Sequence, residues 1–332
     1  MQHQPCPLNP KTLGETSKVL FRGTALFRLA RIWVSLLVLA LSMTAQAQES
    51  ASFRAGDGSS SADANAREVM GQVINNLKEA ERAQYLYERI ERVETRKDSG
   101  DKEPQKTWVT RVVPAGTGIA KINLGLDAKP VNTDYYRAEL DRVLKSLLWA
   151  AESGPQQRDA YQKVQKKQKD REDLIEATRN AFIFTYVASE PRGDRTLLKY
   201  RMEPNPSFKP TNRATSIYAK VKGIVWVDEA SHQLARVEGE VTDDISLGLF
   251  LAKIYKGSKF LQDRYETAPG LWMPSFSQYD FDGRKLFTNI SIHEKTFYTD
   301  YKHIGPPAQA IPRIQSEIAQ LDAMKAKPGA DR

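Results

Sequence analysis

The side chains that could do chemistry in this chain are few and widely spaced. Three of the four histidines, His232, His293 and His303, lie in the last third of the sequence. No two of them have the close spacing that lets paired histidines bind one metal ion. The sequence therefore predicts no metal site. Each histidine is interpreted as a surface or core-edge residue.

Acidic pairs are the second place where chemistry could occur. Two carboxylates can act as acid and base if they face one another across a cleft. Asp243-Asp244 instead falls between two predicted strands, where aspartate favours turns by bonding backbone N–H groups. Asp280 lies beside Asp282, and Asp282-Gly283 is typical of a two-residue hairpin turn. We expect a protein that is not an enzyme, with an uncommon hydrolase as the alternative.

The beginning of the chain has the three parts of an export signal. A basic leader precedes an apolar run at residues 32–43, and Ala45-Gln46-Ala47 supplies a small-x-small cleavage pattern. The apolar run is too short to cross about 30 Å of hydrocarbon as a helix. Residues 1–47 are therefore predicted to be a cleaved signal peptide, with a retained anchor as the alternative. The mature protein is expected in the periplasm, or secreted.

Charge and cysteine usage narrow the range of partners. The formal net charge is +8, but the leader holds five basic residues and one acidic residue, so half of this excess leaves with it. Nucleic acid is therefore not an expected partner. Cys6 is the only cysteine and also belongs to the leader. The mature chain thus has no disulfide, thiol nucleophile or thiolate ligand, and no cofactor is predicted.

Helical spacing of apolar residues predicts two helices that could cover a sheet. One spans residues 65–80 and the other residues 133–151. Residues 48–64 are rich in Ser, Gly, Ala and Asp, and are expected to form a disordered tether. Residues 155–180 are mostly Gln, Lys, Arg, Asp and Glu, which favours a solvated surface helix.

Strand-like runs separated by turn signals fill most of the remaining chain. Residues 84–113 and 181–202 predict hairpins, and residues 223–303 predict a longer meander. Pro269-Gly270 fits a type II turn within the meander. This succession is typical of one large antiparallel sheet.

Together these elements predict an α+β fold. We expect a curved antiparallel sheet that forms a half-open β-barrel, covered by the helices at 65–80 and 133–151. A single domain is expected to span residues 65–303, with a helical insertion at about 133–180 and a C-terminal tail at 304–332.

A sheet that is incompletely covered leaves a cavity lined by large apolar side chains, which is the usual form of a small-ligand site. The alternative is that each of these side chains belongs to an ordinary core. The candidate lining residues are Phe182, Phe184, Tyr186, Trp226, Phe250, Trp272, Phe276 and Phe281.

Three segments carry a family resemblance. Gly223-Ile224-Val225-Trp226-Val227-Asp228 is followed after a turn by Gln233-Leu234-Ala235-Arg236-Val237-Glu238, and Ala268 to Pro274 opens a later strand. With the export signal and helices, this pattern resembles the LolA/LolB-like periplasmic lipoprotein-carrier superfamily, whose fold also occurs in RseB-type stress regulators. The likeness spans residues 65–303, and the charged insertion departs from it.

The resemblance implies a half-open barrel with helices as a lid. It also implies a lipid, an acyl chain or a lipidated protein as ligand, and a role as carrier or sensor with transient membrane-surface contact. The alternative is a non-catalytic envelope interaction module whose core is filled.

Overall fold

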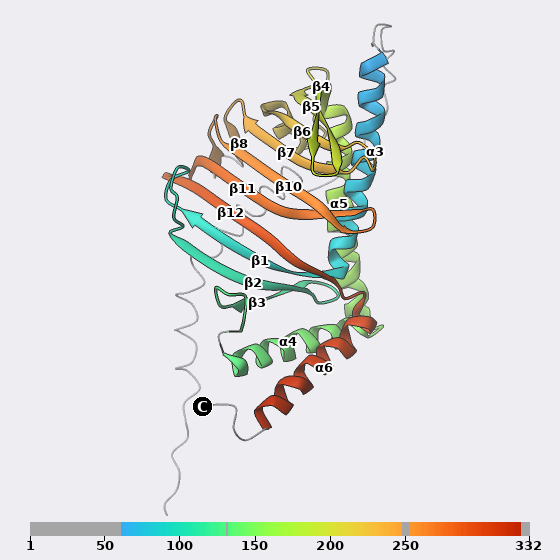
Figure 1. Cartoon of the computed structure of the whole chain (residues 1–332), viewed down its shortest axis with the longest axis vertical. Coiled ribbons are helices and arrows are strands. Elements are labelled where there is room, and N and C mark those ends of the chain that lie inside the picture. Colours follow the sequence, from blue (N-terminus) through green and yellow to red (C-terminus); the bar gives the residue numbers. More distant parts are fainter. Residues whose placement is uncertain (1–60, 131, 248–251, 327–332) are drawn as a thin grey trace, which may run out of the picture.

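The computed structural model describes residues 61–130, 132–247 and 252–326 (Figure 1). The predicted signal peptide, most of the predicted tether and Phe250 lie outside these residues. Helix α3 already begins at Ser61, inside the stretch predicted as tether, and continues to Ala83. A short 3-10 helix, η1 (Gln84–Leu86), leads from it into the first strand.

One antiparallel sheet of twelve strands forms the body of the molecule (Figure 1). The strands are β1 (Tyr87–Arg96), β2 (Lys106–Pro114), β3 (Ile119–Leu124), β4 (Phe182–Arg192), β5 (Arg195–Pro204), β6 (Val221–Asp228), β7 (Leu234–Val241), β8 (Ile245–Leu247), β9 (Ala252–Ile254), β10 (Lys259–Ala268), β11 (Leu271–Lys285) and β12 (Thr288–His303). Their hydrogen-bonded order is β3-β2-β1-β12-β11-β10-β7-β6-β5-β4, with β8 and β9 beside β11. The predicted α+β class with an open, curved antiparallel sheet is confirmed.

Strand register divides the side chains between two faces. Successive residues of a strand point to opposite faces, and directly paired residues point to the same face. Tyr200 pairs with Val225, which pairs with Val237, and we call the face that they share the inner face. Trp226 pairs with Arg236, and these two lie on the outer face.

Helix α3 covers the inner face. Its buried residues Val69, Met70 and Val73 pack in one cluster with side chains of β4, β5, β6 and β10. Helix α5 (Pro155–Ala181) runs beside α3 (Figure 1) and turns directly into β4. The charged helix predicted at 155–180 is therefore present, but it lies against α3 with Leu174 and Ile175 buried.

Helix α4 (Thr133–Ala151) packs on the opposite face, which corrects the predicted cover. The outer face can be followed across the sheet through directly paired residues. These are, in order, Arg236, Asp263, Phe276, Phe297 and Arg92 of β1. Ile90 lies two residues before Arg92 and pairs with Arg111, which in turn pairs with Ile122. Ile122 packs against α4. The helix predicted at 133–151 is thus correct in extent but wrong as a cover of the inner face.

The predicted C-terminal tail contains a structural helix. Helix α6 (Pro307–Ala326) packs against α4, and its Ala310, Ile314 and Ile318 share a buried cluster with Leu140 and Leu147. Alanine and isoleucine at helical spacing supply the apolar stripe that this packing requires. The segment therefore belongs to the folded body and completes the outer-face layer.

The predicted turn at Asp282-Gly283 is also wrong. Strand β11 continues to Lys285, and Gly283 pairs with both Ile290 and Ile254. The turn lies at Leu286-Phe287, where Leu286 has a φ of 54°. A Cβ on Gly283 would approach the Lys253 carbonyl oxygen to 2.2 Å. Close backbone contact with β9, and not a turn, explains this glycine.

Two leucines of α4 test this packing. Leu140 is fully buried, whereas Leu148 is 45% exposed. We expect Leu140→Ala to lower the free energy of unfolding by about 2–5 kcal/mol, because it leaves a cavity between α4, α6 and the sheet. Leu148→Ala is expected to change it by less than about 1 kcal/mol. Urea unfolding measures both values, and equal losses would contradict the placement of α4.

Candidate functional site

The sheet separates the aromatic residues predicted to line one cavity. Phe182, Phe184, Tyr186 and Phe281 lie on the inner face. Phe182 and Phe281 are buried in the cluster under α3, and Phe184 packs against it. Tyr186 is 47% exposed and contacts Tyr200, with ring centroids 5.8 Å apart.

The other described candidates lie on the outer face. Trp226 and Trp272 share a small buried cluster with Leu197 and Ala235. Phe276 packs on Phe297, with ring centroids 5.1 Å apart. Lys199 and Arg236 lie over the ring of Trp226, at 5.1 Å and 5.5 Å from its centroid. These tryptophans are therefore core residues of the face turned away from α3.

The inner face and α3 form the first candidate site. The side chains between them are closely packed: Val221, Val227 and Val241 are completely buried, and Tyr218 is nearly so. Tyr218 donates to the Leu174 carbonyl oxygen at 3.1 Å and so joins η2 (Thr215–Lys220) to α5. The apolar face thus exists as predicted, and side chains of the protein fill it.

Polar contacts join α3 to α5 more than to the sheet. Lys78 pairs with Glu176 at 2.7 Å, Arg82 with Glu172 at 2.5 Å, and Glu81 with Arg171 at 2.7 Å. Toward the sheet region, the side chain of Asn76 on α3 makes two hydrogen bonds. Its amide donates to the carbonyl oxygens of Ser231 and His232, at 3.2 and 2.9 Å.

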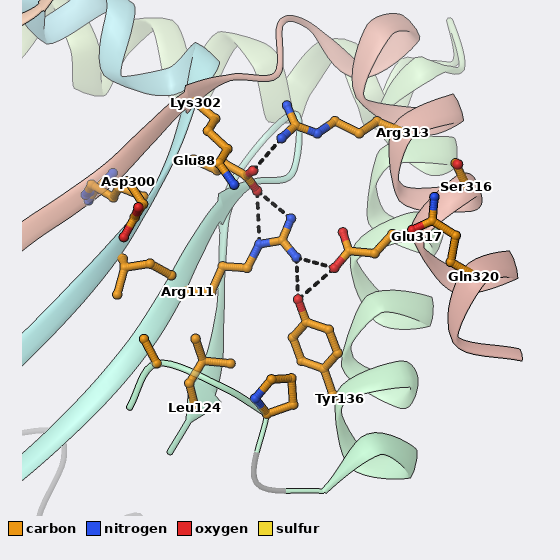
Figure 2. A pocket seen from close by; sticks show the side chains of 14 residues that line it. Glu88, Arg111, Leu124, Tyr136, Asp300, Lys302, Arg313, Ser316, Glu317 and Gln320 are labelled. Atoms are coloured by element: carbon orange, nitrogen blue, oxygen red, sulfur yellow. Dashed lines mark hydrogen bonds and ion pairs between the residues drawn. The ribbon is translucent and has the colours of Figure 1, made fainter. Parts of the chain in front are cut away.

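A polar pocket of about 650 Å³ lies at the other end of the sheet (Figure 2). Strands β1 and β2 supply Glu88 and Arg111, α4 supplies Tyr136, and α6 supplies Arg313 and Glu317. None of these residues stood out in the sequence, because four separate elements must meet before they form a group.

Arg111 is the centre of this pocket. Its Nε and Nη2 donate to Glu88 Oε2 at 3.0 and 2.5 Å, and its Nη1 donates to Glu317 Oε1 at 2.6 Å. The Tyr136 hydroxyl donates to the same Glu317 oxygen at 2.7 Å, and Arg313 Nη2 donates to Glu88 Oε1 at 2.8 Å. This buried network joins α4 and α6 to the sheet.

The electrostatics of the network favour a structural role. Burial alone would raise the pKa of Glu317, but hydrogen bonding to Arg111 and the charge of Arg111 outweigh it and lower this pKa. Burial raises the pKa of the Tyr136 hydroxyl to about 12. Glu317 is thus held ionised and Tyr136 neutral near pH 7, so neither is poised for proton transfer. In the ranges that the structure describes, no cluster of ligand-type side chains suits a metal ion.

Removing Arg111 tests the network. Arg111→Met leaves the buried Glu88 carboxylate and the partly buried Glu317 carboxylate short of a partner, so we expect the free energy of unfolding to fall by about 3 kcal/mol. Arg142→Met is the matched control, because Arg142 is exposed on α4 and is expected to contribute less than about 0.5 kcal/mol. Similar urea midpoints for both variants would show that the network is not stabilising.

The lowered pKa of Glu317 predicts a pH dependence. A carboxyl whose pKa is lower in the folded state stabilises the protein above its unfolded pKa of about 4.3. That contribution is lost as the pH falls through the folded pKa. The difference in unfolding free energy between the native protein and Glu317→Gln should therefore be largest near pH 7 and shrink below about pH 4.3. A difference that is constant over this range would contradict the assignment.

Comparison with known proteins finds similar solved structures, among them the following two. A LolA superfamily protein from Nitrosomonas europaea is 10% identical, with 71% of this chain and 92% of that chain covered and a TM-score of 0.29. An outer membrane lipoprotein-sorting protein domain from Vibrio parahaemolyticus is 12% identical, with coverages of 70% and 92% and a TM-score of 0.28. No family model and no curated protein matches. At these TM-scores the backbones superpose only in part, and nothing about a ligand follows.

Proposed function

We propose that the protein is an exported, non-enzymatic binding protein that holds a hydrophobic ligand between α3 and the inner face of its sheet. The observation that carries this proposal is the way α3 covers that face. Its Val69, Met70 and Val73 provide apolar contacts, and its polar contacts lead mainly to α5. Because the contacts of α3 with the sheet are mainly apolar, a hydrophobic ligand of similar size could take the place of its side chains on the inner face.

The structure represents the closed state in this proposal. The apolar side chains of α3 occupy the place that the ligand would take, so ligand and helix compete for the same surface. Each methylene that leaves water contributes about 0.8 kcal/mol. Displacing α3 costs part of this gain, which keeps affinity moderate and allows release. A carrier or a sensor needs such reversible binding.

The cellular setting of the proposal rests on the leader at residues 1–47. Export would place the protein in the periplasm or outside the cell, where a lipid, an acyl chain or a lipidated protein is the fitting partner. Loading and release would then involve transient contact with a membrane surface. No helix within the described residues is long and apolar enough to cross a membrane.

The second candidate is an envelope interaction module without a ligand. The close packing under α3 favours it, because residues such as Val221 and Val227 are completely buried. Native mass spectrometry of the purified protein separates the two candidates. Co-purified lipid supports the binding protein, whereas a ligand-free mass under conditions that preserve known lipid complexes supports the module.

A reversible disulfide between α3 and the sheet region tests whether α3 must move before a ligand can bind. Asn76 contacts the His232 backbone carbonyl oxygen at 2.9 Å, so Asn76→Cys with His232→Cys, in a Cys6→Ser chain, puts one thiol on each of the two residues that this contact joins. We expect the oxidised protein to lose binding of cis-parinaric acid and the reduced protein to regain it, because the disulfide holds α3 on the sheet.

The control for this experiment carries serine at positions 76 and 232, and is treated with the same oxidant and reductant. Its binding should not respond to redox conditions. Unchanged binding by the oxidised cysteine variant, with the disulfide verified by mass, would contradict a moving α3.

A further inference from the structure

We propose that Arg264 binds the anionic group of the ligand, and that the ligand is therefore an anionic amphiphile. This inference rests on the proposed function and makes it more specific. Its basis is a buried arginine at the place where the apolar cluster under α3 gives way to polar residues.

Strand β10 carries Arg264 on the inner face. Phe260 belongs to the apolar cluster under α3, and Gln262 follows it on the same face. The register shifts at a bulge between Asp263 and Arg264, opposite Pro274, and the Arg264 guanidinium bonds the side chain of Gln262, which lies on the inner face. Its charge acts on Glu81 of α3, which places the guanidinium on the side that α3 covers.

Arg264 makes no hydrogen bond or ion pair to a carboxylate among the residues that the structure describes, although the charge of Glu81 acts on it. Its Nη1 donates to the Gln262 side-chain oxygen at 3.2 Å, and its Nη2 donates to the Trp272 carbonyl oxygen at 2.8 Å. Both acceptors are neutral, although the residue is only 8% exposed. The nearby carboxylate of Glu81 is engaged by Arg171 at 2.7 Å.

Burial of such a cation is costly. An arginine taken out of water without a carboxylate loses hydration that neutral acceptors only partly replace. The same burial lowers the pKa of Arg264. An anion placed beside it would recover this energy, because charge-assisted bonds to a guanidinium are stronger than neutral ones and can form in pairs.

Along both α3 and β10, the residues that face this site change from apolar to polar toward the C-terminal end of the element. On α3, Val73 and Leu77 are followed at helical spacing by Glu81. On β10, Phe260 is followed by Arg264, about 13 Å away at the rise of a strand. An acyl chain lying in the cluster under α3 would thus bring its terminal anionic group to Arg264. A fatty-acid carboxylate and a phospholipid phosphate share this chemistry.

The test compares an acid with its neutral ester. We expect the native protein to bind cis-parinaric acid at least about tenfold more tightly than its methyl ester, since one charge-assisted contact is worth this factor. Arg264→Met should bind both probes as weakly as the native protein binds the ester. Arg92→Met is the matched control, because Arg92 is a half-exposed arginine on the outer face, and it should keep the preference.

Two further measurements complete the test. Arg264→Lys retains the charge without the paired geometry, and an intermediate preference is expected for it even if Arg264→Met fails to fold. Displacement of the probe by phosphatidic acid but not by diacylglycerol would assign the phosphate as the natural anion, and displacement by fatty acid alone would assign the carboxylate.

Equal affinity of the native protein for acid and ester would overturn the role of Arg264 while leaving the proposed function intact. Retention of the preference by a folded Arg264→Met protein would do the same. Binding of neither probe would overturn the proposed function, and this inference with it.

Discussion

The alternation of side chains along each strand is the constraint on which this structure depends. A broad sheet has two faces, and both carry large apolar residues that must be removed from water. One pair of helices, α3 and α5, covers the inner face, and a second pair, α4 and α6, covers the outer face at the far end. For the proposed function, this division between faces decides which residues could contact a ligand.

The two helical layers are fastened in different ways. Helices α4 and α6 are joined to the sheet by a buried charge network centred on Arg111, in addition to their apolar cluster. Helix α3 lies on the sheet through apolar contacts and one asparagine, while its charges pair with α5. Breaking a buried ion pair is expensive, whereas one apolar surface can replace another. This difference is the reason that the proposed function assigns movement to α3 and not to α4 or α6.

Local pattern was enough to predict the elements but not their arrangement. The helix at 133–151 was predicted with the correct ends, because its apolar spacing and the Asn132 cap are local signals. The face that it covers depends on long-range pairing, which no local pattern encodes. The same limit explains why the sequence could not separate Trp226 and Trp272 from the inner-face aromatic residues, and why it did not indicate the group of Glu88, Arg111, Tyr136 and Glu317. The turn predicted at Asp282-Gly283 was wrong because the sequence does not distinguish a glycine required where two strands approach closely from a glycine required in a turn.

Photolabelling with a diazirine fatty acid reports which face of the sheet contacts the proposed ligand. We expect labelled peptides from α3 and from inner-face strands, such as those that carry Phe182 and Phe281. Labelling confined to the outer-face residues Trp226 and Trp272, or to α4 and α6, would contradict the proposed function.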